Sequence, residues 1–335
     1  MLTGYTKTDN NKFLIIEDMF KLEPAYKDYL WGGSTLKEKY DKKCDFNKVA
    51  ESWELSANED GLCKIATGCF SGKTFDNFLE NVGKEALGTK YCENEKFPLL
   101  IKFIDAKKKL SIQIHPDDNY AKKVEHGLGK TEMWYIIDCK ENAYIYYGLK
   151  KDSSKEEIER RVKDNTITEI LNKVYVKKND VFFVEPGTIH AIGSDILVCE
   201  IQQNSNSTYR LYDYDRKDKD GNTREIHMEK ALDVVNTKKN EVEKNIYKPE
   251  RKNGYTRQLL ADCKWFSTTK YDVETEAEIN VTEASFLAVT VVEGSGEIED
   301  DSMAIKFKAG DTIFITAGKK TVKVKGKCLI LTSNM

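Results

Sequence analysis

The stretch Asn179-Asp-Val-Phe-Phe-Val-Glu-Pro-Gly-Thr-Ile-His190 reads as a turn, an acidic residue, a short apolar strand and a second turn. The stretch Gly310-Asp-Thr-Ile-Phe-Ile-Thr-Ala-Gly-Lys-Lys-Thr321 repeats this order, with a glycine again three residues before the last position. A histidine ends the first copy and a threonine ends the second. Short apolar strands between turn residues are typical of β-sandwiches and β-barrels. The echo therefore predicts two related β-domains, of which only the first has a potential metal ligand at this position.

The echo resembles the second motif of the cupin superfamily, whose members fold as small jelly-roll barrels. This resemblance implies a mainly β protein with some α, made of two cupin-type jelly-roll β-barrels plus a few helices. At 335 residues the chain exceeds the usual size of one core. We expect a metal-binding catalytic barrel with N-terminal mixed α/β elements over residues 1–240, a charged linker over 241–255, and a second, metal-free β-domain over 256–335.

Hydrophobic periodicity predicts short strands along most of the chain. Those expected before the linker cover residues 49–56, 97–104, 110–114, 132–138, 143–148, 174–176, 180–184, 190–192, 196–203 and 208–214. Helices are expected over 74–87, 155–163 and 226–235. The second of these helices follows Ser154, which forms a capping-box signature with Glu157.

Composition excludes several classes of protein. With 33% charged residues, 40% hydrophobic residues and a net charge of −3, the chain is typical of soluble proteins and lacks the basic field of a nucleic-acid binder. The apolar run 13–16 is too short for a signal peptide core or a membrane span. None of the eight cysteines forms a Cys-x-x-Cys pair, which argues against a thiolate zinc site. We expect a cytoplasmic protein with reduced thiols that binds neither nucleic acid nor membrane.

Four side chains form a candidate metal site. Gln113 and His115 are two residues apart, so on a strand they point to the same face. Glu132 opens another strand after a glycine-containing turn, and His190 ends the stretch quoted above. Two imidazoles, a carboxylate and an amide oxygen suit a borderline divalent ion such as zinc. These ligands come from three segments, so they converge only if the sheet curls as it does in a small barrel.

Each of these residues also has a simpler interpretation. An isolated histidine on a strand is usually a hydrogen-bonded core or surface residue, and only the combination of motifs favours a ligand role. His126, in a glycine-containing turn, and His227, at the start of the helix expected over 226–235, are not expected to bind a metal. Asp117 and Asp118 follow Pro116 and are expected to be turn or cap residues rather than a catalytic pair.

Two cationic side chains accompany the candidate ligands. Lys130 lies two residues before Glu132, and Arg210 lies in a tyrosine-rich strand where it would share a face with Arg216. A guanidinium suits a phosphate or a developing enediolate oxygen. The alternative for Arg210 is a salt bridge to Asp213 or Asp215.

Taken together, these segments resemble type I phosphomannose isomerases, which are zinc enzymes of the cupin class. The resemblance rests on Phe97–Lys102, Leu110–Asp118, Gly129–Tyr135, Glu185–Ala191 and Tyr209–Arg216. The chain resembles the short bacterial form, which lacks the long helical insertion of the fungal and enteric enzymes.

The resemblance implies roles for individual residues, carried over by position. The implied ligands of one Zn²⁺ per chain are Gln113, His115, Glu132 and His190. The implied catalytic residues are Arg210 and Lys130, and the implied substrate-binding residues are Lys102, Ser111 and Asn206. One departure stands out: the family has an aspartate four residues before its catalytic arginine, and this chain has Asn206 there.

The implied reaction interconverts mannose 6-phosphate and fructose 6-phosphate through a zinc-assisted cis-enediol mechanism. The expected partner is a small sugar phosphate, and the expected state is a monomer or weak homodimer. The general base stays open between a zinc-bound water, a ligand carboxylate and Lys130. Two alternatives also stay open: an isomerase of free mannose or another aldose, and a non-catalytic sugar-phosphate-binding cupin, which Asn206 favours.

Overall fold

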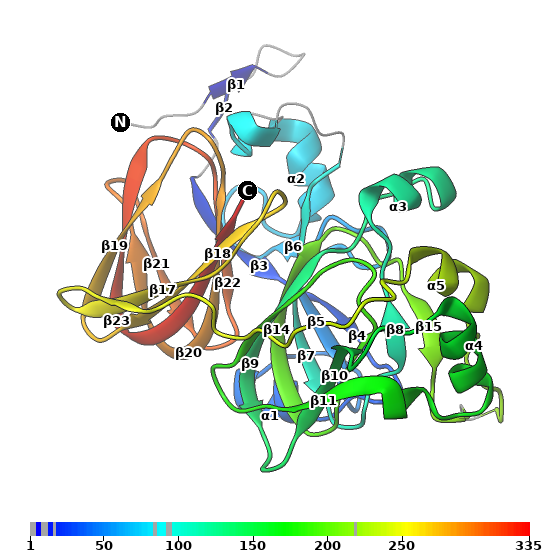
Figure 1. Ribbon diagram of the computed structural model, residues 1–335. Helices are drawn as coiled ribbons and strands as arrows, with labels where there is room; N and C mark the ends of the chain where they lie inside the picture. The colour runs from blue at the N-terminus through cyan, green and yellow to red at the C-terminus, as the bar shows by residue number, and fades with distance from the viewer. Residues whose placement is uncertain (1–4, 8–12, 16–17, 83–85, 92–95, 218–219) are drawn as a thin grey trace.

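The computed structural model describes residues 5–7, 13–15, 18–82, 86–91, 96–217 and 220–335. Two antiparallel sheets that face one another form the first half of the molecule (Figure 1). The six-stranded sheet has the order β12 (Val181–Val184), β9 (Glu132–Cys139), β14 (Ile196–Gln203), β7 (Leu99–Ala106), β5 (Glu51–Leu55) and β4 (Ala25–Lys27). The five-stranded sheet has the order β11 (Leu171–Tyr175), β10 (Tyr144–Leu149), β13 (His190–Ile192), β8 (Ile112–Ile114) and β15 (Tyr209–Tyr212).

The six-stranded sheet is covered on both faces, which explains why all eight residues of β14 are buried. On one face, Trp134 and Val198 pack with Ile145 and Ile192 of the five-stranded sheet. On the other face, side chains such as Phe103 pack against the C-terminal half of the chain. A strand that is buried on both faces shows an apolar run instead of alternation, as residues 196–199 of β14 do.

A ten-stranded antiparallel sheet forms the second half of the molecule. Its path is β16 (Glu250–Arg251), β17 (Tyr255–Asp262), β18 (Ser267–Val273), β23 (Lys320–Asn334), β20 (Leu287–Glu299), β22 (Thr312–Ile315), β3 (Met19–Glu23) and β6 (Lys64–Ile65). β19 (Glu276–Val281) pairs with β23, and β21 (Ala304–Lys308) pairs with β20. A separate two-stranded sheet joins β1 (Tyr5–Lys7) and β2 (Phe13–Ile15).

Strands β3 and β6 belong to the N-terminal part of the sequence, yet they extend the C-terminal sheet. Aromatic rings hold this junction together around Phe314 of β22. The ring centroids of five phenylalanines lie 5.0–6.4 Å from that of Phe314, and they belong to Phe20, Phe75, Phe78, Phe97 and Phe286. Each such buried aromatic side chain contributes about 1.5–3 kcal/mol through removal of its surface from water. The two halves therefore share one apolar core.

The internal echo corresponds to a turn that occurs twice. In the first copy the Asp180 carboxylate accepts a hydrogen bond from the Lys177 amide at 3.1 Å, and β12 follows. In the second copy Asp311 accepts from the Lys308 amide at 3.0 Å, and β22 follows. The residue before each aspartate has a positive φ, 72° in Asn179 and 91° at the equivalent glycine. Asparagine and glycine are the residues that tolerate this conformation.

The helices are few and short. They are α1 (Thr35–Tyr40), α2 (Phe75–Val82), α3 (Asp118–Val124), α4 (Lys155–Lys163) and α5 (Met228–Val234), with 3₁₀ turns at Thr89–Tyr91 and Ile167–Ile170. The N-cap half of the predicted capping box is confirmed, because the Ser154 hydroxyl accepts from the Glu157 amide at the start of α4. The Glu157 carboxylate lies 3.4 Å from the Lys151 ammonium. The predicted helix over 74–87 extends past α2 into residues outside the described part of the chain.

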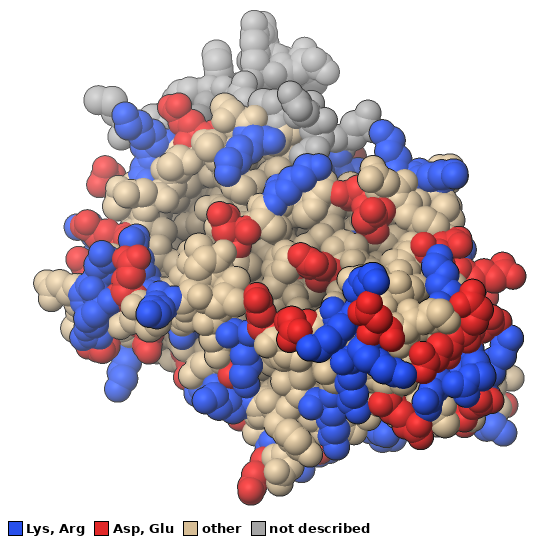
Figure 2. Space-filling view, in the orientation of Figure 1, with Lys and Arg blue, Asp and Glu red and all other residues tan. Residues whose placement is uncertain are grey.

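The mainly β class is confirmed, whereas two closed barrels are not, because the described strands form open sheets. The division of the chain at residues 240 and 256 stays a prediction. The strand predicted over 208–214 ends early: Tyr214 and Asp215 have φ values of 59° and 52°, which extended strands do not adopt. Among the described residues, no helix has the length and apolar character that a membrane-spanning segment requires. On the face shown in Figure 2, acidic and basic side chains are interspersed.

Candidate metal centre

Three neighbouring strands of the five-stranded sheet place three predicted site residues side by side. In the register of the sheet, His190 of β13 lies opposite Gln113 of β8, and Gln113 lies opposite Arg210 of β15. Directly opposed residues of antiparallel strands point to the same face of the sheet. Two candidate ligands and the candidate catalytic arginine therefore share one face.

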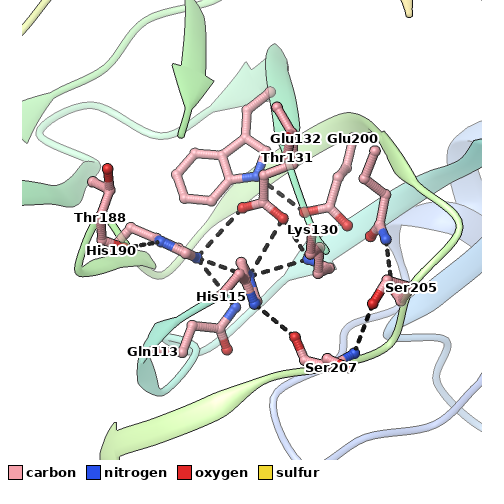
Figure 3. Close-up of polar contacts among 12 residues, drawn as sticks. Gln113, His115, Lys130, Thr131, Glu132, Thr188, His190, Glu200, Ser205 and Ser207 are labelled. Carbon is pink, nitrogen blue, oxygen red and sulfur yellow. Dashed lines mark hydrogen bonds and ion pairs between the residues drawn. The ribbon is translucent and has the colours of Figure 1, made fainter. Parts of the chain in front are cut away.

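The facing sheet supplies the carboxylate. Glu132 is the first residue of β9, and His115 follows β8 immediately before Pro116. Ligand atoms of His115, Glu132 and His190 lie within 4.8 Å of one another, and all three residues are buried (Figure 3). The predicted convergence of these three side chains is confirmed.

The hydrogen bonds of the two histidines fix their tautomers. His115 Nδ1 lies 2.9 Å from the Ser207 carbonyl oxygen, and His190 Nδ1 lies 2.9 Å from the Thr188 carbonyl oxygen. Because a carbonyl can only accept, each Nδ1 carries the proton and each Nε2 keeps its lone pair. The two Nε2 atoms lie 3.1 Å apart. Burial lowers the pKa of His115 and lowers that of His190 to about 4, so both rings are neutral near pH 7.

The carboxylate and amide of the group also suit a metal ion. Glu132 Oε1 is buried and has no hydrogen-bond partner in the described part of the chain. Burial raises the pKa of Glu132, and a bound cation would oppose this by favouring the charged form. The Gln113 amide nitrogen lies 3.5 Å from His190 Nε2, and its oxygen lies 3.5 Å from the Ser111 hydroxyl. Rotation of this amide by 180° would turn its oxygen toward the histidines. The donor set thus fits a borderline divalent metal.

Lys130 lies against the same group. Its ammonium donates a hydrogen bond to Glu132 Oε2 and lies 3.1 Å from His115 Nε2 (Figure 3). The side chain is buried, with 4% of its surface exposed. A cation held this close to two candidate ligands is placed to contact anything that binds beside them.

A row of side chains crosses the six-stranded sheet next to Glu132. It pairs Trp53 with Lys102, Lys102 with Glu200, and Glu200 with Trp134 on successive strands. The Lys102 ammonium lies 3.5 Å from Glu51 and 3.4 Å from Glu200. Burial alone would lower the pKa of Lys102, but the two carboxylates outweigh it and raise that pKa. The charge of Lys102 is therefore already balanced.

Glu51, Glu200 and Trp134 had no predicted role. Glu200 accepts a hydrogen bond from the Trp134 indole at 3.0 Å, and Glu51 accepts one from the Trp53 indole at 2.6 Å. The available signal was a single carboxylate within the apolar run of β14. Buried charges require partners, so such a residue indicates a polar site on that face of the sheet.

Arg210 lies at the edge of the site. Its guanidinium donates to the Glu225 carbonyl at 2.8 Å, and burial lowers its pKa. The alternative salt bridge to Asp213 is not formed in the described structure, because that carboxylate accepts hydrogen bonds from Arg216 and Arg224 instead. The guanidinium therefore has no carboxylate partner among the contacts described.

The remaining predicted residues lie at different depths. Ser111 is buried beside Gln113. Asn206 is exposed and donates a hydrogen bond to the Asp60 carboxylate at 2.9 Å. Asp117 caps α3 by accepting from the Tyr120 amide, so its predicted cap role is confirmed. Asp118 is instead the first residue of α3, and its carboxylate accepts from the Gly129 amide and the Gln203 side chain.

The fold and the site together define the class of the protein: a mainly β protein in which two facing sheets supply a buried histidine–carboxylate group that can hold a metal ion. A family model described as the type I phosphomannose isomerase catalytic domain matches residues 19–144. A second model, described as the mannose-6-phosphate isomerase cupin domain, matches residues 256–335. The chain belongs to the type I phosphomannose isomerase family of enzymes.

Relatives support this assignment along almost the whole chain. The chain is 37% identical over 316 residues to the protein YvyI of Bacillus subtilis, covering 94% of this chain and 98% of that protein. It is 35% identical over 314 residues to the mannose-6-phosphate isomerase ManA of Bacillus subtilis, with coverage of 93% and 98%. The crystal structure of the mannose 6-phosphate isomerase from Bacillus subtilis superimposes with a TM-score of 0.88 at 35% identity, covering 95% of this chain and all of that chain.

Proposed function

We propose that this protein is an aldose–ketose isomerase that interconverts mannose 6-phosphate and fructose 6-phosphate. One Zn²⁺ per chain would be held by Gln113, His115, Glu132 and His190. One arrangement carries the proposal. The Nε2 lone pairs of His115 and His190 face each other beside the buried Glu132 Oε1, which has no hydrogen-bond partner among the described residues. Arg210 lies on the strand next to the one that carries Gln113. The names of the relatives supply the substrate.

The reaction requires transfer of a proton from C2 of the open-chain aldose to C1, and of a hydroxyl proton from O2 to O1, through a cis-enediol. Bound zinc supplies Lewis-acid polarisation of a sugar oxygen. Arg210 supplies a fixed positive charge for the oxygen that becomes negative as the enediolate forms. Lys130 supplies a proton donor beside the same oxygens. Burial of the site strengthens both electrostatic interactions.

Lys102, Ser111 and Asn206 are proposed to bind the substrate. Because Glu51 and Glu200 balance the charge of Lys102, its contribution is a hydrogen bond to a hydroxyl group rather than capture of the phosphate. Ser111 offers a hydroxyl next to Gln113. Asn206 offers an amide at the exposed side of the site, where it is already oriented by Asp60.

Because two carboxylates balance the charge of Lys102, this residue also favours a second candidate function, the isomerisation of free mannose or another aldose. A third candidate, a non-catalytic sugar-phosphate-binding cupin, draws on Asn206 in place of the family aspartate. The two-barrel description, the monomeric or weakly dimeric state and the cytoplasmic location stay predictions.

A coupled assay of fructose 6-phosphate formation separates these functions. The zinc-loaded protein should turn over mannose 6-phosphate with a higher kcat/KM than free mannose shows in the corresponding fructose assay. Arg210→Ala should lower kcat at least about 100-fold, whereas Arg257→Ala, an exposed arginine paired with Glu250, should leave it unchanged. Faster turnover of mannose would select the second function, and sugar-phosphate binding without turnover would select the third.

A further inference from the structure

The backbone of Arg210 is held from outside the sheet. β15 is the last strand of the five-stranded sheet, and within the described part of the chain no strand pairs with its outer edge. The Arg210 amide donates to the imidazole Nδ1 of His227 at 3.1 Å, and the Arg210 carbonyl accepts from the His227 amide at 2.8 Å. One residue thus satisfies both backbone groups of Arg210, which an unpaired edge strand would leave to water.

The same short segment fixes the Arg210 side chain. The Glu225 carbonyl accepts a hydrogen bond from the guanidinium at 2.8 Å. The Nε atom of Arg210 is buried and has no hydrogen-bond partner among the described residues. Residues 225–227 therefore contact both the guanidinium Nη1 atom and the backbone of Arg210.

The imidazole of His227 is not used for the helix that it precedes. His227 is the N-cap residue of α5, but its side chain makes no capping hydrogen bond. Because Nδ1 accepts from an amide, the proton of the neutral ring is on Nε2, which lies 3.8 Å from the Glu225 carboxylate. Burial lowers the pKa of His227, which is consistent with a neutral ring. The hydrogen bond that the His227 side chain makes is therefore to the backbone of β15 and not to α5.

We propose that His227 is a positioning residue that, through Nδ1 and its own amide, fixes the edge strand at Arg210 so that the guanidinium stays aimed at the substrate beside the metal ligands. This inference rests on the proposed function, because it takes Arg210 to act on the bound sugar. Among the described residues, His227 contacts Arg210, Glu225 and Tyr209 and none of the candidate metal ligands. Misplacing a catalytic group by about 1 Å can cost about 100-fold in rate, so a device of this kind has a measurable effect.

Two matched substitutions test the geometry. In His227→Asn, the side-chain oxygen stands at nearly the same distance from Cα as Nδ1 and can accept from the Arg210 amide. In His227→Gln, the amide group lies one methylene further along. We expect kcat for mannose 6-phosphate to fall about 10- to 100-fold in His227→Gln, with KM and zinc content unchanged. We expect His227→Asn to retain kcat within about threefold.

A second measurement tests the hydrogen bond between the Arg210 amide and His227 independently of activity. Hydrogen exchange of the Arg210 amide should be at least about tenfold faster in His227→Gln than in the native protein, and close to native in His227→Asn. Equal kcat values in both variants, or native protection of the Arg210 amide in His227→Gln, would overturn the proposal. If the native protein does not turn over mannose 6-phosphate, the proposed function and the catalytic part of this inference both fail. Hydrogen exchange of the Arg210 amide then decides whether the His227 side chain holds the Arg210 backbone.

Discussion

The Nε2 atoms of His115 and His190 face each other at 3.1 Å, while both Nδ1 atoms are committed to backbone carbonyls. Two lone pairs at this distance repel each other unless a cation or a proton lies between them. Low pKa values in both rings disfavour the proton. The Lys130 ammonium is one neighbouring cation, and the unpartnered Oε1 of Glu132 leaves a ligand position for a second. This relationship is the physical basis for a metal centre.

Loss of one ligand should remove the metal. For His115→Ala we expect zinc content to fall to near zero and activity to fall more than about 100-fold, because changes to residues that only support a ligand already cost 10- to 100-fold. Elemental analysis of the purified protein measures the metal. His126→Asn is the matched control, since His126 is exposed and its φ of 54° suits asparagine. Full zinc content in His115→Ala would contradict the assignment of this ligand.

Lys130 should separate catalysis from metal binding. Lys130→Met removes the ammonium that Glu132 Oε2 accepts from, so the carboxylate has one competitor fewer for a metal ion. We expect zinc content to be retained while kcat falls about 100-fold or more, the magnitude expected for loss of a proton-transfer group. Parallel metal analysis and steady-state kinetics provide the check. Native kcat would remove Lys130 from the mechanism.

A buried ion pair should stabilise the junction between the two halves of the molecule. The Lys42 ammonium lies 2.7 Å from the Glu54 carboxylate of β5 and donates to the Gly310 carbonyl, and Thr312 also donates to Glu54. Lys42→Met leaves a buried carboxylate without its cation, so the free energy of unfolding should fall by about 3–5 kcal/mol. Urea denaturation measures this change.

The exposed pair of Arg251 and Glu274 is the control for that substitution. Arg251→Ala should change the free energy of unfolding by at most about 1 kcal/mol, because exposed pairs are screened by water. Equal effects of the two substitutions would show that the Lys42–Glu54 pair adds nothing at the junction.

The Asp213 carboxylate should make the free energy of unfolding depend on pH in the acid range. Burial disfavours its carboxylate, but hydrogen bonds from Arg224 and Arg216 outweigh burial and hold its pKa below the ordinary 3.8. The unfolded chain therefore takes up a proton before the folded protein does. The stabilisation is present above pH 3.8 and is lost as the pH falls through the lowered pKa.

Comparison of native protein with Asp213→Asn tests this sign. Near pH 7 the variant should be less stable by about 1.5–3 kcal/mol, since it loses charged hydrogen bonds. The gap should narrow as the pH falls below 3.8 in urea denaturation. A gap that is constant with pH would show that Asp213 titrates normally in the folded protein.

The strands and the ligand triad were the parts most accessible to prediction. The predicted strands at 190–192 and 196–203 have the same bounds as β13 and β14, because turn residues on either side of a buried run limit where the strand can begin and end. His115, Glu132 and His190 were found through short-range spacing within motifs. The family resemblance supplied the order in which the segments come together.

Other features depend on contacts that spacing does not encode. The pairing of β3 with β22 joins residues almost 300 positions apart, and no local pattern specifies it. Glu51 and Glu200 can be recognised as ion-pair partners only once β7 is known to place Lys102 between them. The sequence pattern places His227 at the start of a helix, and its contact with Arg210 appears only when the edge of the sheet is known.

The most direct test of the account is a zinc titration of the chelator-treated protein, followed with mannose 6-phosphate in the coupled assay. We predict no turnover without metal and a linear rise in activity that stops at one zinc per chain, with His115→Ala showing no rise. Turnover that persists in the metal-free protein, or a folded and zinc-loaded protein that produces no fructose 6-phosphate, would contradict the account.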